Sequence, residues 1–196
     1  MRSWLRTASC LELRESPGRS GTPPTTWPTN SAISRKAELP ALVLFIHPHC
    51  PCSRATIGEL AILMAHSHGQ VNANVVFVKP AGFGEAWEKT DLWSSATDIP
   101  AVSVSVDEGG VEARLFRSET SGQAALYSAP GQLVFSGGIT GSRGHSGDND
   151  GRTAILSILA TGKAAAKTET PVFGCPLVRD TASQQSEEFC NGSDVN

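Results

Sequence analysis

Two cysteines and two histidines lie within six residues of this chain, in the stretch HPHCPC. The cysteines are Cys50 and Cys52, separated only by Pro51, and the histidines are His47 and His49. A thiolate can attack a disulfide sulfur, and a second thiol nearby can then release the mixed disulfide. Thiolate and imidazole groups also bind Cu(I) or Zn²⁺. The stretch therefore offers two kinds of chemistry, thiol–disulfide exchange and metal binding.

This stretch lies between a predicted strand and a predicted helix. The apolar run at residues 42–46 favours a buried strand, and residues 52–66 carry apolar side chains at helical spacing. Pro51 suits the first helical turn, where no amide hydrogen is needed. A helix start presents free amide hydrogens and partial positive charge, which lower the pKa of a thiol placed there. The position thus favours a reactive thiolate.

The order of the residues predicts a different role for each thiol. We expect Cys50, in the turn, to be the more exposed thiol and the nucleophile, and Cys52 to be the resolving thiol. Protonated His47 and His49 could add positive charge. A Cys-Pro-Cys disulfide closes a small ring that proline stiffens, so we expect strain, which raises the reduction potential. The pair is then a better oxidant or isomerase than a reductant.

The metal alternative uses the same residues as ligands. Copper or zinc would be the cofactor in this alternative, whereas thiol–disulfide exchange requires no cofactor. His145, in the glycine-rich loop at residues 141–151, is a further neighbour that the fold could bring to the site. The candidate metal ligands are His47, His49, Cys50, Cys52 and Cys175.

The remaining cysteines are Cys10, Cys175 and Cys190. A total of five is odd and too small for a disulfide scaffold. Cys10 and Cys190 lie in tail-like segments and are predicted to be incidental thiols. Cys175, between a glycine and a proline, is either an extra resolving thiol or a buried residue that anchors the tail.

Composition narrows the class of protein. The chain has 196 residues, of which 39% are hydrophobic and 18% charged, which fits one domain with appendages. The net charge of −3, without a basic block, argues against nucleic acid as a partner. No run of 18 apolar residues is present, so no membrane span is expected. The first twenty residues lack the apolar stretch of a signal peptide or anchor, so either the protein is cytosolic or its true start lies upstream.

The rest of the chain predicts an α/β fold with a mixed β-sheet sandwiched by α-helices. Early strand–helix–strand units require parallel strands, and a late hairpin adds antiparallel ones. Residues 1–38, rich in proline, glycine and threonine, are expected to be a disordered or weakly ordered lead, and residues 168–196 a tail. Further strands are predicted at 74–80, 101–106, 123–127 and 132–136, and further helices at 85–97, 111–117 and 153–167.

These features together resemble the thioredoxin-like superfamily, in the branch related to TlpA and the peroxiredoxins. The stretches FIHPHCPCSRA, FSGGITGSRGH and VFGCPL are most similar to RedB-type proteins. The superfamily resemblance covers residues 39–167. It implies a redox-active turn at a helix start, with Cys50 as the attacking thiol and Cys52 as the resolving thiol.

The resemblance also carries expectations about substrate and location. It implies a thiol-disulfide oxidoreductase acting on a thiol or disulfide substrate, expected to be a protein, and an extracytoplasmic location; the oligomeric state stays open. The chain departs from the family where a cis-proline normally packs beside the thiols and holds extended substrate backbone. That position falls at or near Gly122. The absence of this proline argues against generic protein-disulfide exchange.

Overall fold

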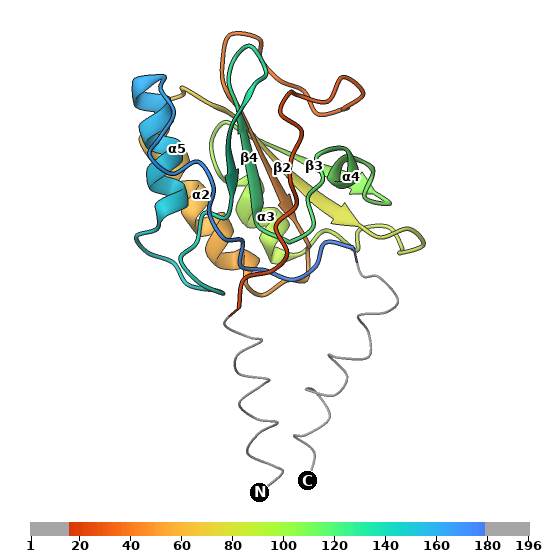
Figure 1. Ribbon diagram of the computed structural model, residues 1–196. Helices are drawn as coiled ribbons and strands as arrows, with labels where there is room; N and C mark the ends of the chain where they lie inside the picture. Colours follow the sequence, from red (N-terminus) through yellow and green to blue (C-terminus); the bar gives the residue numbers. More distant parts are fainter. Residues whose placement is uncertain (1–15, 179–196) are drawn as a thin grey trace, which may run out of the picture.

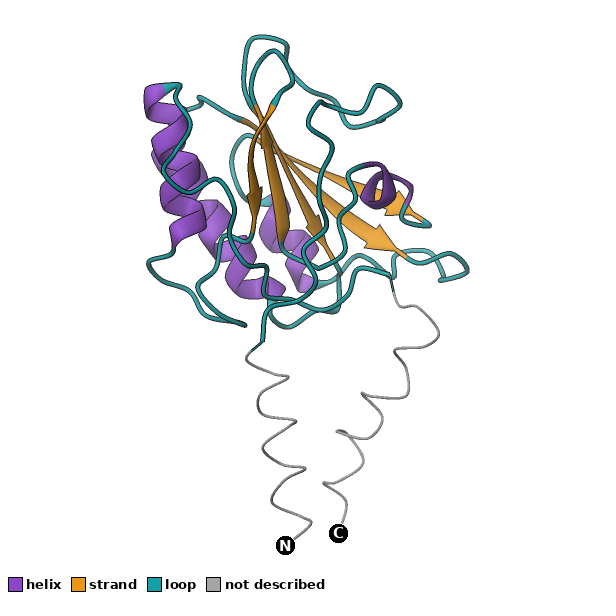
Figure 2. Ribbon diagram, in the orientation of Figure 1, coloured by secondary structure: helices purple, strands orange, loops and turns teal. Residues whose placement is uncertain are grey.

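The computed structural model describes residues 16–178, and these contain a single five-stranded sheet (Figures 1 and 2). The strand order is β3-β2-β1-β4-β5, so β1 is central. β2 runs parallel to both β1 and β3, whereas β4 is antiparallel to β1 and β5 antiparallel to β4. The strands are β1 (Ala41–Ile46), β2 (Asn72–Lys79), β3 (Val102–Glu108), β4 (Gln123–Tyr127) and β5 (Leu133–Gly137).

Helices cover both faces of this sheet. The helices α2, α3 and α5 bury apolar side chains against one face, and the short helix α4 packs on the other. Their bounds are α2 (Ser53–Ser67), α3 (Asp91–Thr97), α4 (Val111–Leu115) and α5 (Asp150–Thr161). This arrangement confirms the predicted α/β fold, a mixed β-sheet sandwiched by α-helices. None of the helices within residues 16–178 has the length and apolar character needed to cross a bilayer.

The central strand β1 supplies both halves of the core. Because side chains alternate along a strand, Leu42 and Leu44 face α2 and α5, whereas Val43 and Phe45 face α4. Every residue of β1 is buried. A strand buried on both faces reads as a continuous apolar run, which is why the sequence pattern located it.

Residues 16–38 differ from the weakly ordered lead expected from their composition. The ring of Trp27 packs edge-on against Phe116 and Tyr127, with centroids 5.1 and 5.3 Å apart. Gly18 N–H donates a hydrogen bond to Val172 O at 2.8 Å. The five-residue helix α4 leaves part of its face of the sheet uncovered, and the Trp27 segment covers it. Residues 1–15, with Cys10, lie outside the described part of the chain.

The beginning of the C-terminal segment is also packed against the domain. Val172 and Leu177 are buried, and isolated bridges join Glu169 to Ser136 and Pro176 to Thr120. Residues 168–178 therefore form part of the folded body (blue in Figure 1). The rest of the predicted tail, from residue 179 on and including Cys190, lies outside the described residues.

Two predicted helices have different bounds in the structure. The helix expected at 85–97 excludes Ala86, whose φ is +64°, and begins only at Asp91, after the extended N-cap residue Thr90. The last helix begins earlier than expected because Asn149 caps it, accepting a hydrogen bond from Arg152 N–H. It ends at Thr161 because Gly162 takes the left-handed conformation, with a φ of +66°.

Candidate active site

The cysteines of the HPHCPC stretch lie where β1 turns into α2. Cys50 N–H donates to His47 O at 3.1 Å, and Cys50 O accepts from Ser53 N–H at 3.0 Å. Cys52 occupies the N-cap position of α2, and the first turn of that helix contains no acidic residue. Pro51 lies exposed between the two cysteines. The structure thus places both thiols at the electropositive start of a 15-residue helix.

A third cysteine joins the pair from the C-terminal segment. Cys175 N–H donates a hydrogen bond to Cys50 Sγ, with the nitrogen 3.3 Å from the sulfur. The thiols of Cys175 and Cys52 also hydrogen-bond to Cys50. All three are free cysteines. The site is therefore a cluster of three thiols, here called the thiol cluster.

The three thiols of the cluster have pKa values shifted in opposite directions. Hydrogen bonds from the Cys175 and Cys52 thiols lower the pKa of Cys50 far below the ordinary thiol value and outweigh the opposing effect of burial. The Ser53 hydroxyl and Cys175 N–H lower this pKa further. The pKa values of Cys52 and Cys175 are raised, because each thiol donates to Cys50 and is partly buried. These opposite directions favour Cys50 as the thiol that ionises first, with Cys52 and Cys175 as its donors.

The exposure of the thiols differs from the prediction. Cys50 is 0% exposed, whereas Cys52 and Cys175 are partly exposed. The expectation that Cys50 is the more accessible thiol is therefore wrong for this conformation. The cause is the C-terminal segment, which places Cys175 directly against the Cys50 sulfur. The local pattern around residue 50 carries no sign of a segment 125 positions away.

Two buried serines, Ser53 and Ser121, contact each other next to the HPHCPC stretch. Ser121 Oγ accepts a hydrogen bond from His47 N–H at 2.7 Å and lies 2.7 Å from Ser53 Oγ. If the Ser53 hydroxyl donates to the Cys50 thiolate, the Ser121 hydroxyl must donate to Ser53. The sequence reasoning missed both serines, and Ser121 has no local signal because it is far from the HPHCPC stretch in sequence.

Gly122 lies at the position where the family resemblance places a cis-proline. Its φ is +92°, and a Cβ there would lie 3.1 Å from Thr56 Oγ1 in α2. Gly122 N–H donates to Phe45 O at 2.8 Å, which ties the start of β4 to β1 beside the thiol cluster. The described residues contain no cis peptide bond. Next to Gly122, Ser121 N–H donates to the backbone oxygen of Cys175 at 2.8 Å.

Arg143 joins the thiol cluster to both ends of the described chain. Its Nη1 donates to Gly174 O at 2.9 Å and its Nε to Ser16 O at 3.1 Å. It also hydrogen-bonds to Cys52 and partly offsets the rise of that thiol's pKa. His145, two positions later, is exposed, and no hydrogen bond or ion pair joins it to the thiols in the described part of the chain.

The two histidines of the motif lie against Trp87. The ring centroids of His47 and His49 are 5.6 and 4.5 Å from that of Trp87, and His49 Nε2 is 3.1 Å from Trp87 O. The structure thus brings Cys50, Cys52 and Cys175 together and places the imidazoles beside the indole. Within residues 16–178, no group of three or more His, Cys, Asp or Glu residues is arranged to hold a metal ion.

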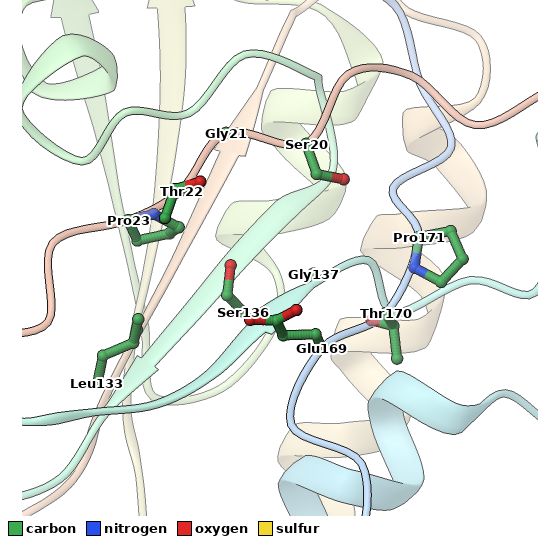
Figure 3. Close-up of a pocket in the computed structure, with 10 residues that line it drawn as sticks. All are labelled: Ser20, Gly21, Thr22, Pro23, Leu133, Ser136, Gly137, Glu169, Thr170 and Pro171. Atoms are coloured by element: carbon green, nitrogen blue, oxygen red, sulfur yellow. The ribbon is translucent and has the colours of Figure 1, made fainter.

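A separate hollow of about 410 Å³ lies at the β5 edge of the sheet (Figure 3). Residues 20–23, β5 and residues 169–171 line it, and Figure 3 shows the side chains of Ser136 and Glu169 in its centre. None of the three cysteines lines it. The hollow is therefore distinct from the thiol cluster.

Comparison with known proteins gives a likeness of fold. No family model matches the chain, and no curated protein matches it. An uncharacterized conserved protein from Geobacillus kaustophilus is 17% identical over 85% of this chain and 93% of its own, with a TM-score of 0.59. A hypothetical protein from Sinorhizobium meliloti is 18% identical over 85% and 98%, also with a TM-score of 0.59. The two solved structures share this chain's fold over most of their length.

Proposed function

We propose that this protein is a thiol–disulfide oxidoreductase in which Cys50 is the ionised, reacting thiol. The observation that supports it most is the set of donors around one sulfur. Cys50 Sγ accepts the amide hydrogen of Cys175 and hydrogen bonds from two thiols and a serine hydroxyl, at the start of α2. A sulfur with this environment is a thiolate at neutral pH, which is the form that attacks a disulfide.

The reaction proceeds by two exchanges at the Cys50 sulfur. The thiolate attacks a substrate disulfide, a mixed disulfide forms at Cys50, and one substrate thiolate leaves. A second thiol then gives its proton to the departing thiolate and attacks Cys50, which releases the other half of the substrate. Cys52 is suited to this step because Arg143, hydrogen-bonded to it, stabilises the negative charge that Cys52 acquires. The same steps in reverse oxidise a dithiol.

The family resemblance supports this assignment at the level of the motif. The stretch that holds Cys50 and Cys52 resembles the active-site turn of the TlpA-related and RedB-type proteins, and Cys175 lies in the VFGCPL stretch of the same resemblance. Gly122 replaces the cis-proline of the wider family. We therefore propose a narrower substrate range than that of a general protein-disulfide reductase.

We further propose that the substrate is a polypeptide rather than a small disulfide. The side chain of Phe83 is 50% exposed and packs at a tilt against Trp87, with ring centroids 4.7 Å apart. Trp87 in turn contacts His49 next to the thiol cluster. An exposed aromatic surface beside a reacting group provides apolar contact area for a protein partner.

Reduction of insulin by dithiothreitol tests the proposal. The wild-type protein should accelerate the reaction, and Cys50→Ser should lose the acceleration, because serine cannot form the mixed disulfide. Cys10→Ser, which removes a thiol of no assigned role, is the control and should retain the activity. Catalysis by Cys50→Ser at the wild-type rate would contradict the proposal, and so would the absence of catalysis in the wild type.

A further inference from the structure

The main chain around Cys175 forms hydrogen bonds with the segment that precedes β4. Residues 173–177, here called the tail segment, run antiparallel to residues 119–121. Ser121 N–H donates to Cys175 O, and Leu177 N–H donates to Glu119 O, both at 2.8 Å. Thr120 and Pro176 form an antiparallel bridge between these hydrogen bonds. Backbone pairing, rather than a side-chain contact alone, therefore sets the position of Cys175.

The approach of the tail segment depends on a glycine. A Cβ at Gly174 would lie 1.9 Å from Ser121 O, so only glycine allows this contact. Gly174 O also accepts the hydrogen bond from Arg143 Nη1. Together these contacts hold Cys175 N–H 3.3 Å from Cys50 Sγ and leave Cys50 without solvent exposure.

We infer that Cys175 is a third redox-active thiol and that the oxidised protein carries a disulfide between Cys50 and Cys175. The inference rests on the proposed thiol–disulfide exchange at Cys50. A Cys50–Cys52 bridge must close a small ring stiffened by Pro51, whereas Cys175 comes from a separate segment and can adopt the disulfide torsion of about ±90°. Cys175 is then the principal resolving thiol.

The electrons and protons balance along this route. When the tail segment lifts, the Cys50 thiolate attacks a substrate disulfide R–S–S–R′, the S–S bond breaks, and R′–S⁻ leaves. The proton of the Cys175 thiol passes to R′–S⁻. The Cys175 thiolate attacks the Cys50 sulfur of the mixed disulfide, and R–S⁻ leaves. The protein has lost two electrons to the substrate, which ends as one thiol and one thiolate.

Disulfide mapping tests the connectivity directly. Cys10→Ser/Cys190→Ser protein is oxidised with glutathione disulfide, alkylated, and mapped by mass spectrometry under non-reducing conditions. We expect the Cys50–Cys175 peptide pair to be the main product. A second measurement is thermal unfolding: a bridge from Cys50 to Cys175 closes most of the domain and should raise Tm on oxidation, whereas a Cys50–Cys52 bridge closes three residues. Mapping that finds only the Cys50–Cys52 bridge would overturn the inference.

Single variants in the same background test the resolving role. The mixed disulfide between Cys50 and glutathione should last about tenfold longer in Cys175→Ser than in the parent, because the principal attacking thiol is gone. Cys52→Ser should change this lifetime by less. The opposite ranking of the two variants would overturn the inference.

Two glycine variants test whether the disulfide depends on the position of the tail segment as well as on the presence of its thiol. Gly174→Ala keeps all three thiols but prevents the close approach to Ser121, so the Cys50–Cys175 product should fall about tenfold. Gly84→Ala is the matched control, because a Cβ at Gly84 meets no atom within 4 Å. Wild-type product from Gly174→Ala would count against the inference, and thermal unfolding confirms that each variant is folded.

The outcomes distinguish this inference from the proposed function. If Cys50→Ser still catalyses insulin reduction, the proposed function fails and this inference fails with it. If Cys50→Ser is inactive but mapping finds the Cys50–Cys52 bridge, the proposed function stands and only the role of Cys175 is wrong.

Discussion

The amide hydrogen of Cys175 points at the sulfur of Cys50 across 125 positions of sequence, with nitrogen and sulfur 3.3 Å apart. This contact makes the C-terminal segment part of the site. It supplies one of the donors that stabilise the Cys50 thiolate, and it covers that thiolate from solvent. The ionisation of Cys50 and its exposure to solvent therefore both depend on the segment around Cys175.

The first prediction concerns the reduction potential. Groups that stabilise the Cys50 thiolate stabilise the reduced protein, which raises the potential of its disulfide. We expect a value above that of thioredoxin, about −270 mV, by equilibration with glutathione buffers. A value below about −300 mV, as in structural disulfides, would contradict the proposed role as an oxidant or isomerase.

The second prediction concerns the pH dependence of stability in the reduced protein. The pKa of Cys50 is lower in the folded state than in the unfolded state, where it is about 8.5. Between these two values the unfolded chain binds a proton that the folded protein does not. The free energy of unfolding should therefore rise with pH by up to about 1.4 kcal/mol per pH unit from this group. This stabilisation is complete above the unfolded value and is lost as pH falls through the folded pKa.

Urea unfolding across neutral pH, under reducing conditions, measures this slope. Cys50→Ser should remove the Cys50 contribution, so the wild type should show the steeper rise. Above about pH 8.5 the free energy of unfolding should fall with pH. The reason is that Cys52 and Cys175 have raised pKa values and stay protonated in the folded protein, while the same thiols ionise in the unfolded chain. Parallel curves for the two proteins would show that Cys50 is an ordinary thiol.

The third prediction is that Arg143 keeps the tail segment packed over Cys50. Its guanidinium donates to Gly174 O and contacts Cys52, so Arg143→Ala should let the tail segment open more often. A hydrogen bond from a charged group contributes about 1.5–3 kcal/mol, so alkylation of Cys50 by iodoacetamide should accelerate about tenfold or more. Arg114→Ala is the control, because Arg114 donates to Gly109 O at 2.7 Å, at the start of α4. Equal rates of Cys50 alkylation in both variants would show that Arg143 does not keep the tail segment in place.

The fourth prediction concerns the buried carboxylate of Glu59 in α2. Glu59 is 0% exposed and accepts hydrogen bonds from Gly147 N–H at 2.8 Å and Asn149 Nδ2 at 3.0 Å, and it pairs with Arg152. Glu59→Gln would leave Arg152 without its buried partner and should cost about 3 kcal/mol of unfolding free energy. Urea denaturation measures the loss.

The matched control for Glu59 is the other carboxylate that contacts Arg152. Asp148 is fully exposed, and its ion pair with Arg152 spans one turn, so Asp148→Asn should change stability little. Since Glu59 also fixes the loop that carries Arg143, Glu59→Gln should accelerate alkylation of Cys50 as well. A similar stability for the two variants would mean that Glu59 does not anchor the loop.

Local patterns in the sequence predicted the elements that position Cys50 and Cys52. The apolar run of β1 and the helical spacing of α2 are short-range signals, and Pro51 marks the junction between them. The parallel pairing of β1, β2 and β3 and the antiparallel hairpin of β4 and β5 also agree with the predicted order of helices and strands. These features depend on neighbours in sequence, so a single chain reveals them.

The contacts that complete the site depend on distant segments and could not be read from the sequence. Ser121 reaches Ser53 across 68 positions, and Trp27 packs on Tyr127 from a segment whose composition suggested weak order. The burial of Cys50 follows from the pairing of Cys175 with Ser121. By contrast, the caps of α5 at Asn149 and Gly162 were visible as local signals and were missed.

The ionisation of Cys50 in the reduced protein is the central claim, and the carbon NMR shifts of isotope-labelled cysteine Cβ atoms test it most directly. The Cβ shift of a cysteine changes when its thiol ionises, and Cys50→Ser, Cys52→Ser and Cys175→Ser assign the signals. We predict that Cys50 is a thiolate at neutral and mildly acidic pH, while Cys52 and Cys175 remain thiols above the usual pKa of about 8.5. Titration of Cys50 near about pH 8.5, together with the other two, would contradict the account.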